Sequence, residues 1–374
     1  MRALIVDEGR ERSSVAAARA LRSTGWTVFA ASPGSSPNIA SRSRATSGWH
    51  RVRHTSEGED AFLESLEQAV RASGCEVVFV TWEAAVAVVS ARRGELNCAV
   101  GYGPHEGVMT VMDKSRLATA AQACGVEVPR SGTIEEAAEG RLGSRVVVKP
   151  ALQSELSGAA QIFDDPAAAV AHARSIDTAG GRALLQEAAS GPLVALTLVA
   201  GSEGIVSIAQ QIAEHSWPRP AGVTARGLTV AVDPDLRARV QQLLLHVGWQ
   251  GLAQLQFIAT EDGRHLLIDF NPRLYGSLAL AVHAGANHPD TFARLATGLP
   301  VQPSEARPGA RYQWFSRDLR ASLSEPNPVL EAARCLTVGA SAAHSLWSWS
   351  EPLLAPGFLA AQAGRALKRR LPGA

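Results

Sequence analysis

Over the first hundred residues, short apolar runs alternate with segments whose apolar positions recur at helical spacing. The runs RALIV, WTVFAAS and EVVFVTW predict buried strands, and SVAAARALRSTG and DAFLESLEQAVRASG predict amphipathic helices that end at glycine. Strands and helices that alternate in this way are typical of a parallel sheet. The pattern predicts a Rossmann-like unit. Because no GxGxxG follows its first strand, dinucleotide binding in the usual manner is disfavoured.

The pattern changes after residue 108. Asp113 can cap a helix that runs to Gly125, and short strands follow, including SRVVVKPA, RALLQEAAS and LVALTLVAG. The last two strands, GLAQLQFIAT and RHLLIDFNPR, are joined by EDG, which is a strong hairpin signal. An antiparallel sheet layer is therefore predicted. Beyond residue 298 the chain is rich in proline, and PGFLAAQAGRALKRRLPGA predicts a final helix with a basic end, which packs on the domain or contacts a membrane surface or partner.

Composition adds mainly exclusions. The 374 residues are 46% apolar and carry 36 Lys and Arg against 35 Asp and Glu, so a globular multidomain protein is expected, without a global field for nucleic acid or anionic membranes. The four cysteines form no CxxC pair, which argues against a disulfide framework and a zinc site. We expect no signal peptide and no stable membrane insertion, because no apolar run approaches about 18 residues. A cytoplasmic protein is predicted.

The stretch HLLIDFNPR brings together the strongest candidate chemistry. Alternation along a strand puts Asp269 and Asn271 on one face, and Gln256 across the hairpin shares that face. Oxygen atoms of these types suit magnesium, which usually also contacts substrate phosphates. Arg273 follows and could hold a phosphoryl or carboxylate group in a bidentate fork. The pattern outlines a metal–nucleotide site, against the alternative of an Asn-Pro turn with a surface ion pair.

Basic residues elsewhere extend this outline. Lys114 opens the middle module and Lys149 ends the strand VVVKP, although a surface lysine at a strand end is the simpler alternative for Lys149. The loop QSELSG after Lys149 could close over phosphates through its backbone N–H groups. Arg219 and Arg226 belong to WPRPAGVTARG, which is expected to be a loop that carries substrate recognition, and Arg219 is a weaker candidate for contact with substrate or phosphate. Arg226 is the candidate for a substrate carboxylate or the transferring phosphate, with a solvated arginine as the alternative.

Four motifs in order resemble those of ATP-grasp enzymes, over roughly residues 1–298. They are DKSRLATAAQACGVEVPRS, VVVKPA, LLQEAASG and GLAQLQFIATEDGRHLLIDFNPRLYGS. The resemblance implies a fold of the α/β and α+β classes, in which a Rossmann-like N-terminal domain precedes the two lobes of an ATP-grasp fold. The predicted divisions are an N-terminal domain, a small lobe, a large lobe with the metal site, and a C-terminal extension packed on the core: residues 1–108, 109–190, 191–300 and 301–374.

The resemblance also implies roles for individual residues. Lys114 and Lys149 would contact the α- and β-phosphates and flank the adenine. Gln186 and Glu187 would lie at the hinge between lobes and accept from the adenine amino group, and Ala189 would supply a backbone N–H.

On the second lobe, the resemblance implies magnesium ligands and an anion site. Gln256, Asp269 and Asn271 match the magnesium ligands. Arg273 matches the arginine that steadies the transferred phosphoryl group, and Ser277 is a weaker candidate for the same anion.

Three positions depart from the family pattern. Leu193 lies near the place where many relatives have a glutamate for the ribose, and Gln256 replaces a common glutamate. The phosphate loop contains only Gly158, so Ser154 and Ser157 are expected to contribute to closure instead.

The implied activity is that of an ATP-dependent carboxylate–amine ligase. Such an enzyme forms an amide or peptide bond through an acyl phosphate, releases ADP and phosphate, and uses ATP with Mg²⁺ or Mn²⁺. The expected partners are a small-molecule carboxylate and an amine, with no nucleic acid, and a homodimer is compatible with the sequence. Two alternatives stay open: a carboxylase or carbamoyl-phosphate-type enzyme, and a regulatory protein that binds ATP without turnover.

Overall fold

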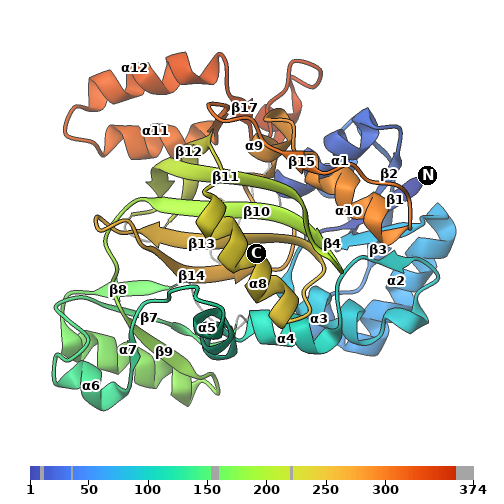
Figure 1. Ribbon diagram of the computed structural model, residues 1–374. Coiled ribbons are helices and arrows are strands. Elements are labelled where there is room, and N and C mark those ends of the chain that lie inside the picture. The colour runs from blue at the N-terminus through green and yellow to red at the C-terminus, as the bar shows by residue number, and fades with distance from the viewer. Residues whose placement is uncertain (9–11, 35–36, 153–159, 220–221, 359–374) are drawn as a thin grey trace, which may run out of the picture.

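The computed structural model describes residues 1–8, 12–34, 37–152, 160–219 and 222–358 (Figure 1). The N-terminal part is a parallel sheet in the order β3-β2-β1-β4-β5. Its strands are β1 (Arg2–Val6), β2 (Thr27–Pro33), β3 (Thr46–Val52), β4 (Val77–Val80) and β5 (Ala99–Val100). Its helices are α1 (Arg12–Ser23), η1 (Ala40–Arg42), η2 (Thr55–Glu57), α2 (Glu59–Ser73), α3 (Glu83–Ala91), η3 (Arg93–Glu95) and α4 (His105–Met112). The predicted Rossmann-like unit is confirmed.

A small antiparallel sheet follows, in the order β6-β9-β7-β8. Its strands are β6 (Ser131–Gly132), β7 (Val146–Pro150), β8 (Gln161–Phe163) and β9 (Ala183–Glu187). Three helices accompany it: α5 (Lys114–Ala123), α6 (Ile134–Ala138) and α7 (Pro166–Thr178). This lobe has its own apolar core, in which Val148 and Leu185 of neighbouring strands pack against Ala169 of α7. The core holds β7 in place and thereby positions Lys149 near its end.

The large sheet has the order β14-β13-β10-β11-β12-β16-β17, with β15 beside β11 (Figure 1). Its strands are β10 (Leu193–Gly201), β11 (Gly204–Trp217), β12 (Val223–Val230), β13 (Gly251–Ala259), β14 (His265–Asn271), β15 (Ser304–Glu305), β16 (Arg311–Gln313) and β17 (Ala343–His344). The helices of this part are α8 (Pro234–His246), α9 (Leu278–His283) and α10 (His288–Ala296). The predicted hairpin is confirmed, because β13 pairs antiparallel with β14 around Gly263, whose φ is 82°.

The N-terminal domain and the large sheet share one continuous apolar core. The rings of Phe79 on β4 and Phe292 on α10 lie 4.7 Å apart, and the indole N–H of Trp26 donates to Asp290 at 2.8 Å. Burial of large aromatic side chains is a major source of stability, so this core fixes the two parts against each other. Residues from distant parts of the sequence can therefore form a site with defined geometry.

The C-terminal extension does more than pack on the core, because it adds β16 and β17 to the large sheet. Helices α11 (Phe315–Leu323) and α12 (Pro328–Gly339) lie beside one another above β12 (Figure 1). Most of the final helix predicted from the basic end, residues 359–374, lies outside the described residues. Within the part of the chain that the structure describes, no helix is long and apolar enough to cross a membrane.

Candidate functional site

Two lysines and an aspartate meet where the small lobe faces the large sheet. The ammonium of Lys114 lies 3.3 Å from Oδ1 of Asp269 on β14, and the ammonium of Lys149 donates to the backbone carbonyl of Ile268 at 2.8 Å. The Lys149 side chain is 6% exposed. These three side chains come from α5, β7 and β14, so the structure brings together residues that the sequence separates by up to 155 positions.

Local structure explains the position of Lys114. Asp113 caps α5 by accepting from the backbone N–H groups of Ser115 and Arg116, at 2.9 and 3.1 Å. The backbone N–H of Lys114 donates to the carbonyl of Ala151 at 2.9 Å, just beyond the end of β7. A capped helix start is thus attached to the strand that carries Lys149. The predicted cap at Asp113 is confirmed.

Burial changes the acid–base behaviour of Lys149. Removal from water lowers its pKa to about 8, with a further lowering by the charge of Lys114, while the carboxylate of Asp269 acts in the opposite direction. Desolvation disfavours the charged form of a lysine, which explains the direction. A buried ammonium with one carbonyl partner retains donor capacity for an anion that enters the site.

Amide side chains continue this cluster across the sheet. Gln256 lies directly opposite Asp269 in the hairpin, and Gln254 lies opposite Asn271. The amide nitrogen of Asn271 donates to Asp269 Oδ2 at 3.3 Å and to Gln254 Oε1 at 3.4 Å. The face predicted from alternation is therefore present, and Gln254 belongs to it. Sequence reasoning missed Gln254, although its spacing of two from Gln256 was a usable signal.

Ser277 is buried and lies at the far end of the same polar row. Its hydroxyl accepts from the amide nitrogens of Gln211 at 2.8 Å and Gln254 at 3.4 Å. Gln211 comes from β11, and sequence reasoning missed it as well. Because these hydrogen bonds already hold the hydroxyl, Ser277 orients the turn after Asn271 and retains its own proton as a donor.

Arg273 reaches back to the N-terminal domain. Its Nε donates to Glu83 Oε1 at 2.7 Å, and one terminal nitrogen donates to the carbonyl of Leu274 at 3.0 Å. Glu83 opens α3 directly after β4, at the carboxyl edge of the parallel sheet. Sequence reasoning missed Glu83. The ion pair fixes the guanidinium at the junction of the two parts.

The predicted hinge borders a cavity of about 790 Å³. Glu187 and Ala189 line it, with Val128 and Leu266 on other walls. Gln186 is buried beside it and its amide donates to the hydroxyl of Ser131 at 3.1 Å. Because this amide is held by β6, Gln186 supports the hinge, whereas Glu187 and Ala189 face the space. A cavity of this size is typical of small-molecule sites.

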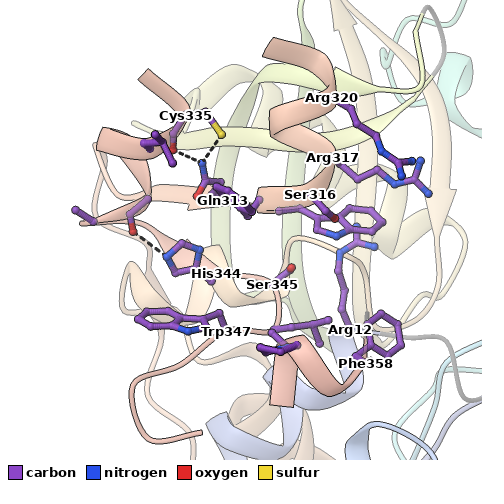
Figure 2. Close-up of a pocket in the computed structure, with 18 of the residues that line it drawn as sticks. Arg12, Gln313, Ser316, Arg317, Arg320, Cys335, His344, Ser345, Trp347 and Phe358 are labelled. Carbon is purple, nitrogen blue, oxygen red and sulfur yellow. Dashed lines mark hydrogen bonds between the residues drawn. The ribbon is translucent and has the colours of Figure 1, made fainter. Parts of the chain in front are cut away.

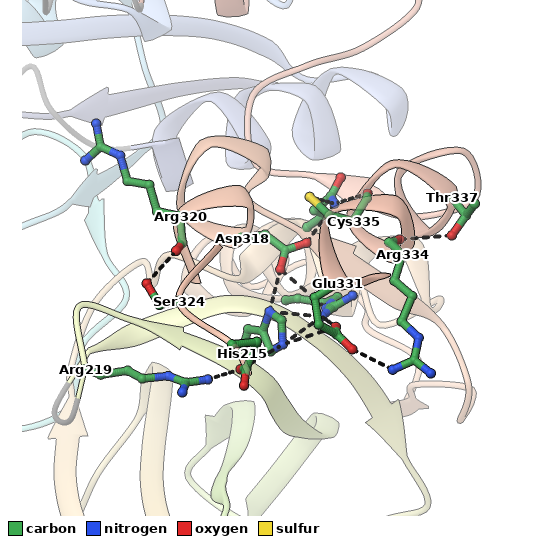
Figure 3. A network of polar contacts seen from close by, with 12 residues as sticks. His215, Arg219, Asp318, Arg320, Ser324, Glu331, Arg334, Cys335 and Thr337 are labelled. Atoms are coloured by element: carbon green, nitrogen blue, oxygen red, sulfur yellow. Dashed lines mark hydrogen bonds and ion pairs between the residues drawn. The ribbon is translucent and has the colours of Figure 1, made fainter. Parts of the chain in front are cut away.

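Arg226 lies elsewhere. It is on β12, four strands from β14, which corresponds to about 19 Å at the usual spacing of neighbouring strands. Its guanidinium is buried among Asp318 at 3.4 Å, Glu331 at 3.1 Å and His215 at 2.8 Å (Figure 3). The structure does not bring Arg226 into the lysine–aspartate cluster, and these partners give it a structural role at the base of α11 and α12. The expected loop around it is shorter than predicted, because β11 and β12 occupy most of it.

Two of the remaining candidates, Arg219 and Leu193, have partners outside the cluster. Arg219 is half exposed and forms an ion pair with Glu325. Leu193 starts β10 opposite Ile258, which leaves the ribose without an assigned partner. Ser154 and Ser157, with the rest of the phosphate loop from 153 to 159, lie outside the described residues.

The donor set on β13 and β14 fits one kind of metal. Among the described residues no group of three or more His, Cys, Asp and Glu side chains is placed to hold a metal ion. The oxygen donors on this face are one carboxylate, that of Asp269, and two carboxamides, those of Gln256 and Asn271. Asp269 Oδ1 is buried and accepts no well-aligned hydrogen bond. Such a set fits magnesium, which keeps waters and takes further ligands from substrate phosphates.

Residues 192–317 match the family model described as "ATP-grasp in the biosynthetic pathway with Ter operon". No curated protein matches the chain. Similar solved structures include the biotin carboxylase domain of Hydrogenobacter thermophilus 2-oxoglutarate carboxylase, a dimer in complex with MgADP, ADP and bicarbonate. It has 14% identity and a TM-score of 0.65, with 82% of this chain and 73% of that chain covered.

Two further similar structures are those of proteins with other activities. The N5-carboxyaminoimidazole synthetase of Staphylococcus aureus, complexed with ADP, has 15% identity, a TM-score of 0.62, and coverage of 81% of this chain and 78% of its own. The L-amino acid ligase of Bacillus licheniformis has 16% identity, a TM-score of 0.61, and coverage of 80% and 75%. At these identities the likeness establishes a shared fold, and the neighbours are both ligases and carboxylases. Residues 192–317 thus match an ATP-grasp family model, and the chain shares its fold with these ligases and carboxylases.

Proposed function

We propose that the protein is an ATP-dependent carboxylate–amine ligase that forms an amide or peptide bond. The observation that carries the proposal is the meeting of Lys114, Lys149 and Asp269 between the small lobe and the large sheet. Two cations beside one carboxylate and two carboxamides suit a polyphosphate with its counter-ion. The adjoining cavity at Glu187 and Ala189 suits the adenine.

In this reaction the substrate carboxylate attacks the γ-phosphate of ATP and displaces ADP, and the amine then displaces phosphate from the acyl phosphate and loses a proton. The lysines neutralise phosphate charge, and Arg273, held by Glu83, steadies the transferred phosphoryl group. Gln256, Asp269 and Asn271 would hold magnesium, which supplies further neutralisation of the phosphates. Positioning and preorganised charge supply the catalysis in such a site, so no protein nucleophile is needed.

The neighbouring structures support one alternative, since two of them belong to carboxylation chemistry. A single assay separates the candidates. Protein and Mg-ATP are incubated with pooled small carboxylates and amines, with bicarbonate alone, or with neither, while ADP and phosphate are measured. The ligase predicts ADP release that requires the carboxylate, and hydroxamate formation when hydroxylamine replaces the amine. Release with bicarbonate alone would favour a carboxylase, and ATP binding without stimulated release would identify a regulatory protein.

The lowered pKa of Lys149 predicts a pH dependence for ATP binding by the free protein. Phosphates bind the charged ammonium, and its folded pKa of about 8 means that this form is lost as the pH rises through 8. We expect the ATP affinity, measured by calorimetry between pH 7 and 9.5, to fall about tenfold per unit above the pKa of Lys149. The matched variant Lys149→Arg stays charged and should show a flatter profile. An unchanged wild-type affinity up to pH 9.5 would refute the role of Lys149.

A further inference from the structure

A second cavity of about 660 Å³ lies between the start of α1 and the C-terminal extension (Figure 2). One wall comes from Arg12 of α1, and the others come from β16, α11, α12 and the segment that follows β17. The cavity is thus built from residues near the two ends of the described chain. Neither the proposed ATP site nor the hinge includes any of its residues.

Three arginines line this cavity: Arg12, Arg317 and Arg320. The guanidinium carbon of Arg12 lies 3.6 Å from the centroid of the Trp314 ring, and that of Arg317 lies 5.1 Å from it. Figure 2 shows the head groups of Arg317 and Arg320 beside one another. Burial lowers the pKa of Arg317, and the charges of Arg320 and Arg12 lower it further. Like charges are therefore gathered at some cost to the folded state.

No acid balances these three cations within the described residues, because none of the ion pairs there involves Arg12, Arg317 or Arg320. The contrast with nearby arginines is direct. Arg19 on α1 pairs with Glu351 at 2.5 Å, and Arg226 pairs with Asp318 and Glu331. An anion supplied from outside would meet a guanidinium cluster suited to bidentate binding.

The other walls are largely aromatic. Trp347, Trp349 and Phe358 line the space together with Trp314 and Phe315. Trp349 is 85% exposed and Phe315 is 43% exposed, although both are large apolar side chains. Small-molecule sites combine such apolar walls with a few convergent polar groups, and the volume of this cavity is within their usual range.

The cavity is connected to the metal-ligand face by one short turn. Arg12 Nε donates to the carbonyl of Gly276 at 3.0 Å, and a Cβ at Gly276 would lie 2.0 Å from an Arg12 nitrogen. The next residue, Ser277, accepts from Gln254, which pairs with Asn271. A molecule anchored by the arginines would therefore lie on one side of the turn that starts at Asn271, and the proposed metal ligands lie on its other side.

We propose that this cavity binds the acid substrate of the proposed ligase, a small molecule whose aromatic body carries, besides the carboxylate that reacts with ATP, a second anionic group, a carboxylate or a phosphate. The arginines Arg12, Arg317 and Arg320 hold the anion, and the tryptophans and phenylalanines cover the ring. The assignment of the bound molecule as substrate rests on the proposed function, whereas the presence of an aryl-anion site does not.

The test is calorimetric titration of the full chain without nucleotide. The probes are 3-phenylpropionate, phenyl phosphate and the neutral 3-phenylpropanol. We expect either anion to bind at least about tenfold more tightly than the alcohol, since a charge-assisted contact to a guanidinium is stronger than a neutral one. Tighter binding of phenyl phosphate than of phenylpropionate would indicate that the second anionic group is a phosphate, and the reverse order that it is a carboxylate.

Variants locate the binding. Arg317→Gln with Arg320→Gln should weaken anion binding at least about tenfold and leave the alcohol unaffected. Arg22→Gln is the matched control, because Arg22 is an exposed arginine on α1 away from the cavity. Thermal unfolding checks that the double variant is folded. Equal anion binding by the wild type and the folded double variant, or no anion binding by the wild type, would overturn the site. A separate Mg-ATP titration reports on the proposed function, so the two failures are distinguishable.

Discussion

Replacement of Asp269 by asparagine is expected to lower substrate-stimulated ADP release at least about a hundredfold, which is the usual effect of removing one preorganised electrostatic group. Asp269 is the only carboxylate in the donor set on β13 and β14, and its Oδ1 lies 3.3 Å from the Lys114 ammonium. The variant removes the charge that balances the two lysines and would attract the metal. Steady-state release of ADP with saturating substrates measures the effect.

The control for this variant is Asp262→Asn. Asp262 lies in the turn of the same hairpin and pairs with Arg264 at 2.7 Å on the exposed surface, away from the lysines. Its replacement should leave ADP release within about twofold of wild type, since exposed ion pairs contribute little. Activity of Asp269→Asn close to that of wild type, with an intact fold by circular dichroism, would contradict the site assigned here.

Replacement of Asp318 by alanine is expected to destabilise the protein by about 3–5 kcal/mol, as is typical when one partner of a buried ion pair is removed. Asp318 is 0% exposed and accepts from His215 Nδ1 and from the amide of Gln313, both at 2.8 Å (Figure 3). Its loss leaves the buried guanidinium of Arg226 without its fully buried counter-charge. Denaturant unfolding followed by circular dichroism measures the change.

Acid should remove the same stabilisation. Burial raises the pKa of Asp318, but hydrogen bonds from His215 and Gln313 and the charge of Arg226 outweigh it, so the pKa falls below its usual 3.8. A lowered carboxyl pKa stabilises the fold fully above 3.8, and this contribution is lost as the pH falls through the folded value.

As a control for Asp318→Ala, Asp164→Asn removes an exposed partner of Arg145 and should cost less than about 1 kcal/mol. Equal losses of unfolding free energy in the two variants would show that the buried contacts of Asp318 do not stabilise the fold.

Local sequence patterns predicted the parts of the site that local structure creates. Alternation in the 265–271 strand was enough to place Asp269 and Asn271 on one face. The position of Gln256 opposite Asp269 also depends on a register shift between Gln256 and Phe257, which the EDG turn does not determine. The cap at Asp113 depends on neighbours in sequence. For the strand face and the helix cap, the periodicity of one element and the chemistry of neighbouring residues determine the geometry.

Contacts between distant segments could not be predicted in this way. Glu83 meets Arg273 across 190 positions, and Arg12 meets the carbonyl of Gly276 across 264. The C-terminal strands β15, β16 and β17 are two or three residues long, too short to show a period, and they form because the large sheet offers them edges. The same packing buries Arg226, which the sequence pattern placed in a loop.

The most direct test of the account is the binding of a magnesium complex of a non-hydrolysable ATP analogue, measured by calorimetry at pH 7 for the wild type and Lys149→Met. Lys149 donates from a buried position to the Ile268 carbonyl, and loss of such a charged donor typically weakens phosphate binding about ten- to a hundredfold. We expect saturable binding by the wild type with one site per chain, and at least tenfold weaker binding by the variant. Absence of binding by the folded wild type, or equal affinities for the two proteins, would contradict the proposed nucleotide site at Lys149.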